Sequence, residues 1–275
     1  MDLELNGKVV LVTGGSDGLG RALCRSLVDE GARVALCARD GDRLDDAVTE
    51  LRTRAEARAE ACARDGQHPP AGGVLGVVAD VTSPRDLAAF VEAVVDTFGP
   101  RIDGLVNNAG RSAAKRIADT DDLDWDADLQ LKLYAAVRLT RLVLPHMARP
   151  GGSIVNVLAI AAKSPGAGSG PSSVSRAAGM ALTKALSKEL GPDGIRANAV
   201  LIGLIESGQW ERVAGARGMT TDDLYRRMAS DAGVPLGRVG RAAEFADTVS
   251  YLLSPRASYV TGTALNLDGG LCAVV

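Results

Sequence analysis

The chain has few of the residues on which metal sites and disulfide frameworks depend. It contains four cysteines and two histidines in 275 residues. The cysteines lie far apart and form no C-x-x-C pair: they are Cys24, Cys37, Cys62 and Cys272. This spacing predicts neither a disulfide framework nor a zinc site, and His68 and His146 are too few for a dedicated metal centre.

Blocks of positive charge and long apolar runs are also missing. The 31 basic and 34 acidic side chains are scattered along the chain and leave a formal net charge of −3, so we expect no nucleic-acid partner. No apolar run reaches the roughly 18 residues of a membrane span. The acidic N-terminal segment, residues 1–5, lacks the cationic region and apolar core of a signal peptide. The sequence therefore predicts a cytoplasmic protein that does not enter a membrane.

Aromatic residues make up 3% of the chain, whereas hydrophobic residues reach 46%. Val, Leu, Ile and Ala must therefore fill the core, which suits buried parallel strands. No Pro-, Gly- or Ser-rich linker divides the sequence. We therefore expect a single domain over residues 1–275.

Short apolar runs alternate with helical patterns almost to the end of the chain. Seven such runs are expected to be strands: 9–12, 33–36, 74–79, 105–106, 153–158, 195–201 and 264–267. One strand per helix requires right-handed crossovers and a parallel sheet covered on both faces. The fold class predicted is α/β, with a doubly wound, Rossmann-type parallel sheet of about seven strands.

Four other segments are predicted from periodicity. Residues 42–64 read as one solvent-facing helix, ended by the Gly- and Pro-rich stretch 65–73. Residues 122–147 and 172–190 read as two further helices. Between about 204 and 234 the strand rhythm gives way to a polar, Gly-punctuated segment, and excursions of this kind at the carboxyl end of a strand are where lids form.

A glycine-rich turn follows the first predicted strand, where residues 13–20 read T-G-G-S-D-G-L-G. Gly14 permits a tight turn, Gly18 lets the backbone approach a pyrophosphate, and Gly20 allows close packing of helix on strand. The N-terminus of the following helix offers free N–H groups to a phosphate. The strand-turn-helix context therefore predicts dinucleotide binding.

Further motifs follow in a fixed order. They are Asp80-Val81, Asn107-Asn108-Ala109-Gly110, Leu144-Pro145-His146-Met147, Asn198-Ala199-Val200, Tyr259-Val260-Thr261-Gly262-Thr263 and Asp268-Gly269-Gly270. Together with the G-x-x-x-G-x-G spacing, they resemble the short-chain dehydrogenase/reductase family over nearly the whole chain, and its 3-oxoacyl-(acyl-carrier-protein) reductases in particular. The resemblance implies an oxidoreductase that uses a nicotinamide cofactor.

The same resemblance implies the cofactor-binding positions. Asp80 would bond the adenine, the loop 108–110 would border the nicotinamide half, and residues 202–205 would pack on the carboxamide. The full set expected is Gly14, Ser16, Gly18, Leu19, Arg39, Asp80, Val81, Asn108, Ala109, Gly110, Arg176, Ile202, Gly203 and Ile205.

The end of the second strand favours NADP(H) over NAD(H). NAD binding in such folds uses a carboxylate there, whereas a 2′-phosphate suits a guanidinium. Ala38 stands where the family's carboxylate would be, and Arg39 follows it. Asp40 and Asp17 would oppose a phosphate if they point inward.

The family's catalytic residues are replaced. The resemblance aligns Ala159 with its serine, Ser172 with its tyrosine, Arg176 with its lysine and Lys132 with its asparagine. A serine hydroxyl is a much weaker acid than a phenol and Ala159 cannot polarise a carbonyl. Arg176, one helical turn from Ser172, can still bind ribose hydroxyls.

Several residues are alternative sources of the missing proton. Lys132 is either a surface lysine or the new site group, because the matched asparagine position points inward. Lys163 and the lid residue Tyr225 are further candidates, whereas Ser173 and Ser175 read as polar residues at a helix start.

Two functions stay open. The first is an NADP(H)-dependent oxidoreductase that interconverts a carbonyl and an alcohol with a non-standard proton donor. The second is a catalytically silent NADP(H)-binding protein or a non-redox enzyme of the same fold. In either case we expect a homodimer or homotetramer built on the helices 122–147 and 172–190, because the second is apolar on several faces.

Overall fold

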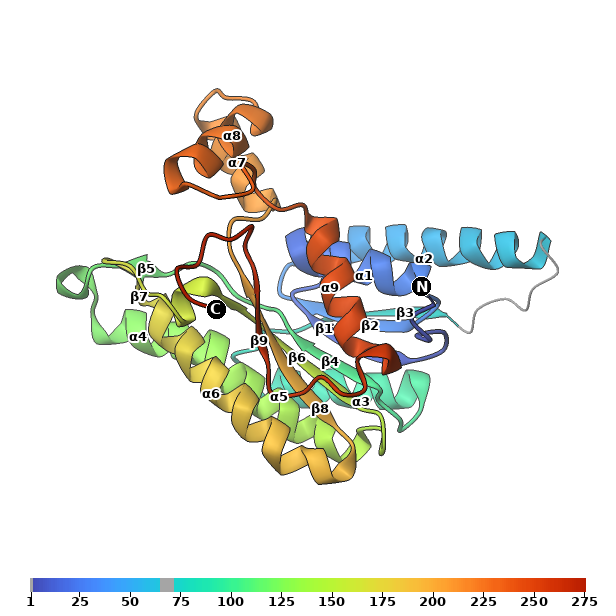
Figure 1. Cartoon of the computed structure of the whole chain (residues 1–275). Coiled ribbons are helices and arrows are strands. Elements are labelled where there is room, and N and C mark those ends of the chain that lie inside the picture. The colour runs from blue at the N-terminus through green and yellow to red at the C-terminus, as the bar shows by residue number, and fades with distance from the viewer. Residues whose placement is uncertain (1, 65–71) are drawn as a thin grey trace.

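Seven parallel strands form the centre of the molecule, in the order β3-β2-β1-β4-β6-β8-β9 (Figure 1). This is a computed structural model, and it describes residues 2–64 and 72–275. The strands are β1 (Val9–Thr13), β2 (Arg33–Ala38), β3 (Gly73–Val78), β4 (Gly104–Asn107), β6 (Ser153–Ala159), β8 (Arg196–Ile202) and β9 (Ala264–Leu267). All seven predicted strands are present within two residues of their expected ends, which confirms the doubly wound sheet. Most of the predicted breaker segment 65–73, with His68, lies outside the described residues.

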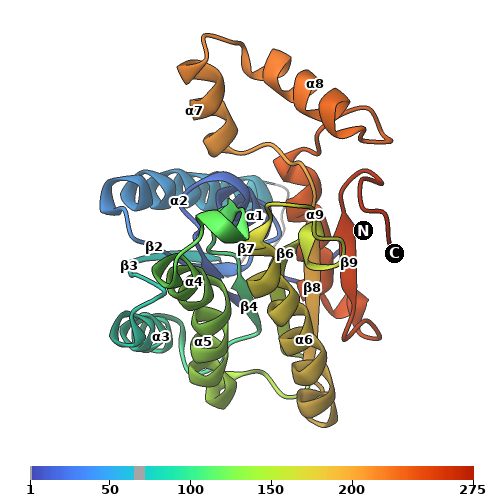
Figure 2. The same cartoon turned by 90° about the vertical axis from the view of Figure 1, so that its left-hand side faces the viewer.

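Helices cover both faces of this sheet (Figure 2). One face carries α1 (Gly18–Asp29), α2 (Gly41–Arg64) and α9 (Ala242–Leu253), and the other carries α3 (Pro84–Phe98), α5 (Ala135–Val143) and α6 (Ser172–Leu190). Each layer has its own apolar core, with Leu23 and Phe245 in the first and Phe90 and Leu139 in the second. Aliphatic side chains make up most of both cores, as the low aromatic content requires.

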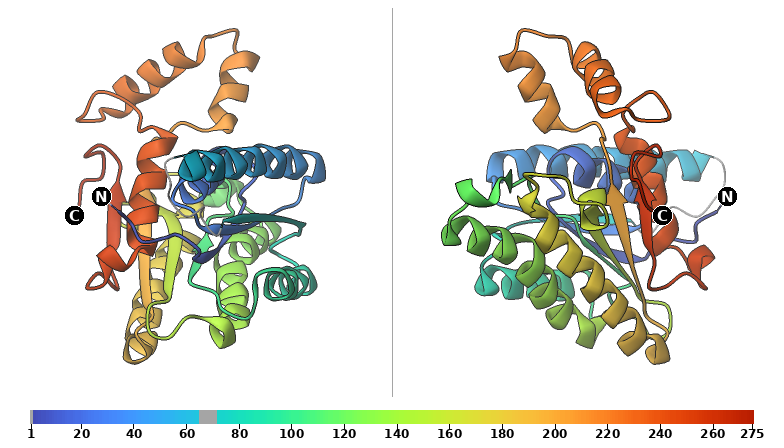
Figure 3. Two further views of the ribbon diagram at one scale, coloured as in Figure 1. Left: turned by 90° about the vertical axis from the view of Figure 1, so that its right-hand side faces the viewer. Right: turned by 60° about the vertical axis from the view of Figure 1, so that its left-hand side comes forward.

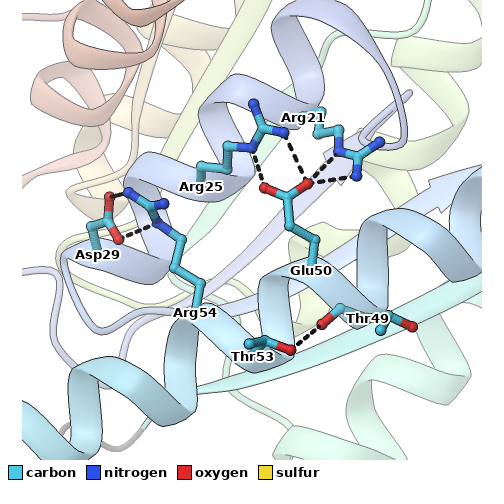
Figure 4. A network of polar contacts seen from close by, with 7 residues as sticks. All are labelled: Arg21, Arg25, Asp29, Thr49, Glu50, Thr53 and Arg54. Carbon is cyan, nitrogen blue, oxygen red and sulfur yellow. Dashed lines mark hydrogen bonds and ion pairs between the residues drawn. The ribbon is translucent and has the colours of Figure 1, made fainter.

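Ion pairs join the two helices that flank the glycine-rich turn (Figure 4). Glu50 of α2 accepts hydrogen bonds from the guanidinium groups of Arg21 and Arg25 of α1, and Arg54 of α2 pairs with Asp29 of α1. The hydrogen bond from Arg25, supported by Arg21, lowers the pKa of the Glu50 carboxyl. Partly exposed pairs contribute little stability each, but together they fix the orientation of α1, whose N-terminus faces the sheet edge.

The predicted helix 122–147 is interrupted, which corrects the expectation of one regular helix. The segment consists of α4 (Asp122–Leu129), a π-helical turn over residues 130–134, α5 and a short 3₁₀ turn at Leu144–His146. In the π turn the Ala135 N–H donates to the Gln130 carbonyl, five residues back. Single π turns insert one residue and redirect the side chains around it. Lys132 lies at the centre of this turn.

Two further features frame the carboxyl ends of the strands. After β8 the chain forms α7 (Gly208–Ala216) and α8 (Thr221–Ala232), which stand away from the body beyond the sheet (Figures 1 and 3). A short antiparallel pair, β5 (Ala114–Lys115) with β7 (Gly170–Pro171), joins the segment after β4 to the start of α6. No helix in residues 2–64 or 72–275 is long and apolar enough to cross a membrane.

Candidate cofactor cleft and catalytic site

A cleft of about 580 Å³ lies at the carboxyl ends of the strands, partly under the lid. The glycine-rich turn, the end of β2, the loop after β4 and the segment after β8 line it. Every predicted cofactor residue except Asp80 is among its lining residues. The positions therefore converge on one site, as the rule for open α/β sheets requires.

The glycine-rich turn has the backbone geometry that its sequence predicts. Gly14 and Gly18 have φ values of +67° and +50°, which only glycine adopts freely. A Cβ on Gly20 would lie 2.1 Å from the Gly14 carbonyl oxygen, so no side chain fits there. The Asp17 carboxylate caps α1 by accepting a hydrogen bond from the Gly18 N–H (2.7 Å).

Thr13 joins the turn after β1 to the loop after β4, and the sequence alone did not indicate this role. Its hydroxyl accepts hydrogen bonds from the N–H groups of Asn108 and Ala109, each at 3.0 Å. In return the Asn108 amide donates to the Thr13 carbonyl (2.8 Å) and the Gly14 carbonyl (3.2 Å). These bonds hold the turn after β1 and the loop after β4 in one arrangement. The signal was the threonine that precedes the first glycine.

At the end of the cleft beside β2, arginines neutralise the negative charge of the carboxylates. Arg43 lies 3.2 Å from Asp40 and 3.8 Å from Asp17, and Arg212 of the lid lies 3.2 Å from Asp17. Arg39 is largely exposed, and its guanidinium is 4.0 Å from Asp80. Asp17 and Asp40 thus carry arginine partners of their own. Arg43, which the sequence reasoning did not single out, adds a second guanidinium beside Arg39.

At the other end of the cleft, two of the replaced positions, Lys132 and Ser172, are connected to one carboxylate. The Lys132 ammonium pairs with Asp128, four residues back, and donates to the Ser172 hydroxyl at 2.8 Å. Ser175 donates to the second oxygen of Asp128 at 2.5 Å. The side chains of Lys132 and Asp128 are 4% and 1% exposed, so the pair is buried. Lys132 therefore points inward, and the surface alternative is wrong in this structure.

The charges of this cluster act on one another. Burial lowers the pKa of the Lys132 ammonium, the hydrogen bond to Asp128 acts against this change, and the Arg176 guanidinium lowers the pKa further. Burial also lowers the pKa of Arg176, which stays charged at any working pH. Arg176 donates to the Val157 carbonyl at 3.4 Å and reaches toward Gly110, whose added Cβ would lie 3.9 Å from its Nη2 atom.

A small cavity of about 20 Å³ connects this cluster with the cleft. Lys132 and Arg176 both line it, and it shares Val81, Ala109, Leu131, Val157 and Arg176 with the cleft lining. The Ser172 hydroxyl accepts from Lys132 and has no acceptor for its own proton in the described part of the chain. Ser172 is buried and adjoins the cavity through Lys132, without itself being one of the lining residues.

The other candidate residues lie elsewhere. Ala159 ends β6 opposite Ile202 and carries no polar group. The Lys163 ammonium donates to the Ala264 carbonyl and the Asn266 amide oxygen, at 2.7 and 2.9 Å, and so belongs to β9. The Tyr225 hydroxyl accepts from the Ser207 N–H within the lid, and this side chain is not part of the cleft lining.

Sequence comparison supports the pattern read from the motifs. A family model described as enoyl-(acyl carrier protein) reductase matches residues 14–272. The chain is 36% identical over 270 residues to the granaticin polyketide synthase putative ketoacyl reductase 1 of Streptomyces violaceoruber, covering 96% of this chain and 92% of the relative.

Solved structures give the same assignment. A short chain oxidoreductase of Pseudomonas aeruginosa, described as containing an atypical catalytic center, superposes with a TM-score of 0.88 at 35% identity and 98% coverage of both chains. L-sorbose reductase of Gluconobacter frateurii, solved with NADPH and L-sorbose, superposes with a TM-score of 0.86 at 33% identity, covering 100% of both chains. The order of the motifs, the sheet topology and these matches along the whole length agree, and the chain belongs to the short-chain dehydrogenase/reductase family.

Proposed function

We propose that this protein is an NADP(H)-dependent carbonyl reductase in which Ser172, backed by Lys132, delivers the proton. One observation carries the proposal. The residue at the family's tyrosine position accepts a hydrogen bond from a buried ammonium and keeps its own proton free.

The cleft residues fit a dinucleotide with a 2′-phosphate. The glycine turn leaves backbone room for a pyrophosphate at the start of α1, and Gly20 lets that helix pack closely on the Gly14 carbonyl. Arg39 and Arg43 supply guanidinium forks at the end of β2, where a 2′-phosphate would lie. Two structural relatives were solved with NADPH, the Pseudomonas oxidoreductase and the sorbose reductase. When bound, NADPH supplies the hydride.

Arg176 suits the binding of the nicotinamide ribose. It stands one helical turn after Ser172 and reaches the loop that borders the nicotinamide half. Its guanidinium donates several hydrogen bonds in a fixed plane, so it binds neighbouring hydroxyls without itself exchanging a proton. Arg176 therefore holds the cofactor and adds positive charge, while the proton comes from another group.

The proton path runs from Lys132 through Ser172. As hydride reaches the carbonyl carbon, the carbonyl oxygen takes the proton of the Ser172 hydroxyl, and Ser172 takes one from the Lys132 ammonium. Lys132 is left as a neutral amine and regains a proton from solvent. Because serine is shorter than tyrosine, the substrate carbonyl must approach α6 more closely than in relatives with a phenol. The ammonium of Lys132 and the guanidinium of Arg176 stabilise the developing oxyanion.

Asp128 is a positioning residue in this scheme. It holds Lys132 through one oxygen and Ser175 through the other, so it fixes the ammonium beside Ser172. The carboxylate also favours the protonated form of Lys132. Its removal therefore changes the pKa of the donor without removing the donor.

The test is turnover of NADPH with a panel of ketones, followed by nicotinamide absorbance. General acid catalysis contributes about 10²–10⁴ in rate, so Ser172→Ala should lower kcat by about 10² or more. Ser173→Ala is the matched control, because this neighbouring serine bonds Ser169 outside the cluster. Wild-type turnover that survives Ser172→Ala would contradict the relay. NADPH binding without turnover on any ketone would favour the silent cofactor-binding alternative.

The pH dependence gives a second measure of the same scheme. Reduction requires the ammonium form of Lys132, so kcat/KM should fall as pH rises through its pKa, at a lower pH than for an exposed lysine. Asp128→Asn should move this fall to still lower pH, because the carboxylate that favours the charged form is lost. A fall that does not move in Asp128→Asn would assign it to another group.

A further inference from the structure

Positive charge exceeds negative charge at the catalytic end of the cleft. Arg111, the residue after the loop 108–110, lines the cleft beside Arg176, and Lys132 lines the adjoining cavity. Asp128 is the carboxylate at this end, and both of its oxygens are already bonded, by Lys132 and by Ser175. Three cations thus lie around the one buried carboxylate of this end, and Asp124 interacts with Arg111 from outside the cleft lining.

Neither Arg111 nor Arg176 forms a close ion pair among the side chains that the structure describes, and Arg176 bonds only the carbonyl of Val157. Arg176 interacts with Asp128 and Arg111 with Asp124 at longer range. The Asp124 carboxylate itself pairs with Lys115 at 2.6 Å. The arginines of the opposite end, Arg43 and Arg212, are in contrast paired with aspartates.

The electrostatic effects at the site agree with this arrangement. Arg176 and Arg111 both lower the pKa of the Lys132 ammonium, so each guanidinium repels that ammonium. A bound anion would relieve this repulsion, and the energy of a charge-assisted hydrogen bond grows where water is excluded.

We propose that the carbonyl substrate is an oxo acid, and that Arg111 binds its carboxylate while Ser172 faces its carbonyl oxygen. This proposal rests on the proposed reductase function. A guanidinium matches a carboxylate through two parallel N–H donors, and Arg111 is exposed at the mouth of the cleft, where an entering acid would meet it. A cofactor phosphate is the less suitable anion for Arg111, because the phosphate-binding turn and Arg39 lie toward the other end of the cleft.

The experiment compares straight-chain oxo acids, in which the distance between carbonyl and carboxylate increases stepwise, with their neutral methyl esters. With NADPH as reductant, at least one acid should exceed its ester in kcat/KM by about tenfold or more, the usual effect of one charge-assisted bond. Arg111→Gln should reduce the ratio of acid to ester toward one. Arg116→Gln, which removes an exposed cation from the same segment outside the cleft lining, is the matched control and should keep the ratio.

A second readout separates this inference from the reductase function itself. Calorimetry on the complex with NADPH measures acid and ester binding without any proton transfer. If no probe is reduced but the acid binds about tenfold more tightly than its ester and loses this advantage in Arg111→Gln, the reductase proposal fails and the anion site stands. Equal rates and equal binding of acid and ester would overturn the inference. A loss of NADPH affinity in Arg111→Gln would instead assign this arginine to the cofactor.

Discussion

The two ends of the cleft differ in how far they keep their family character, and the reason is physical. At the cofactor end the requirement falls on the backbone: Gly14 needs a positive φ, and Gly20 needs the absence of a Cβ. No other residue meets these requirements, so the motif is intact. At the catalytic end the requirement falls on side-chain chemistry, and the resemblance aligns all four of the family's catalytic positions with other residues. A scaffold can therefore keep its cofactor geometry while its proton chemistry is rebuilt.

The changes at the catalytic end are mutually compatible. Lys132 bonds Ser172, and Asp128 accepts from both Lys132 and Ser175. A buried charge without a partner costs several kcal/mol, and unrelated substitutions would leave such groups behind. Lys132, Ser172, Asp128 and Ser175 instead form a hydrogen-bonded network, and Arg176 lies outside it. A site that has lost its function and a site that works with other residues predict different effects of mutation.

The largest effect on stability is expected from removing one partner of the buried ion pair between Lys132 and Asp128. Lys132→Met leaves Asp128 buried with only Ser175 as a donor, and should lower the free energy of unfolding by about 3–5 kcal/mol. The double change Lys132→Met with Asp128→Leu removes both charges and should recover most of this loss, while reduction of ketones stays absent. Urea unfolding followed by circular dichroism measures both variants.

The exposed pair of Lys115 and Asp124 serves as the matched control. Lys115→Met should cost less than about 1 kcal/mol, because this pair is largely solvated. If Lys132→Met lowers the free energy of unfolding no more than Lys115→Met does, Lys132 is not buried against Asp128. The hydrogen-bonded network described for the catalytic end would then be wrong.

A smaller effect is expected at the cofactor end, on NADPH affinity. There the backbone provides most of the expected contacts, and the Arg39 side chain adds one more. Arg39→Ala should weaken NADPH binding by about 10- to 100-fold, the value of one lost charge-assisted contact with the 2′-phosphate. NADH, which lacks that phosphate, should bind wild type and variant equally. Calorimetry with both cofactors measures the four affinities. Equal loss for NADPH and NADH would show that Arg39 holds another part of the cofactor.

The sequence predicts the backbone-dependent end of the cleft much better than the end that depends on side chains. The glycine turn, the strand ends and the loop 108–110 are local patterns with fixed geometry, and they lie where the motifs placed them. Lys132 was recognised as a candidate only because the family alignment placed it on an inward position.

The partners of Lys132 depend on tertiary contacts that sequence patterns do not contain. Asp128 stands four residues before Lys132, a spacing that is common on exposed helix surfaces, so nothing in it indicates burial. The π turn moves Lys132 toward α6, and Ser175 reaches Asp128 from that helix. Both features arise when the two helices pack. Arg43 was missed for a similar reason, because its role depends on how α2 begins beside the cleft.

The smallest effect is expected on self-association. It depends on the outer faces of α2, which begins beside the cofactor end of the cleft, and of α6, which begins at the catalytic end. The outer face of α2, beside the cofactor end, is charged, whereas α6 exposes an apolar stripe that includes Val174, Ala181 and Ala185. Val174 is 49% exposed. We expect this stripe to pair with a second copy of the chain, which gives a homodimer or homotetramer by light scattering at micromolar concentration.

Val174→Ala should weaken that association by about 1 kcal/mol per subunit, or roughly 30-fold for a dimer in which both copies change, because it removes apolar area that the partner would cover. Val78→Ala, at a still more exposed valine at the end of β3, should leave association unchanged. A wild-type monomer would refute the interface, and equal effects of the two variants would locate it elsewhere. Because α6 carries Ser172, whereas most residues that line the cofactor cleft belong to other elements, dilution to the monomer should lower ketone reduction before it lowers NADPH affinity. The two ends of the cleft would then differ in their dependence on assembly as well as in their chemistry.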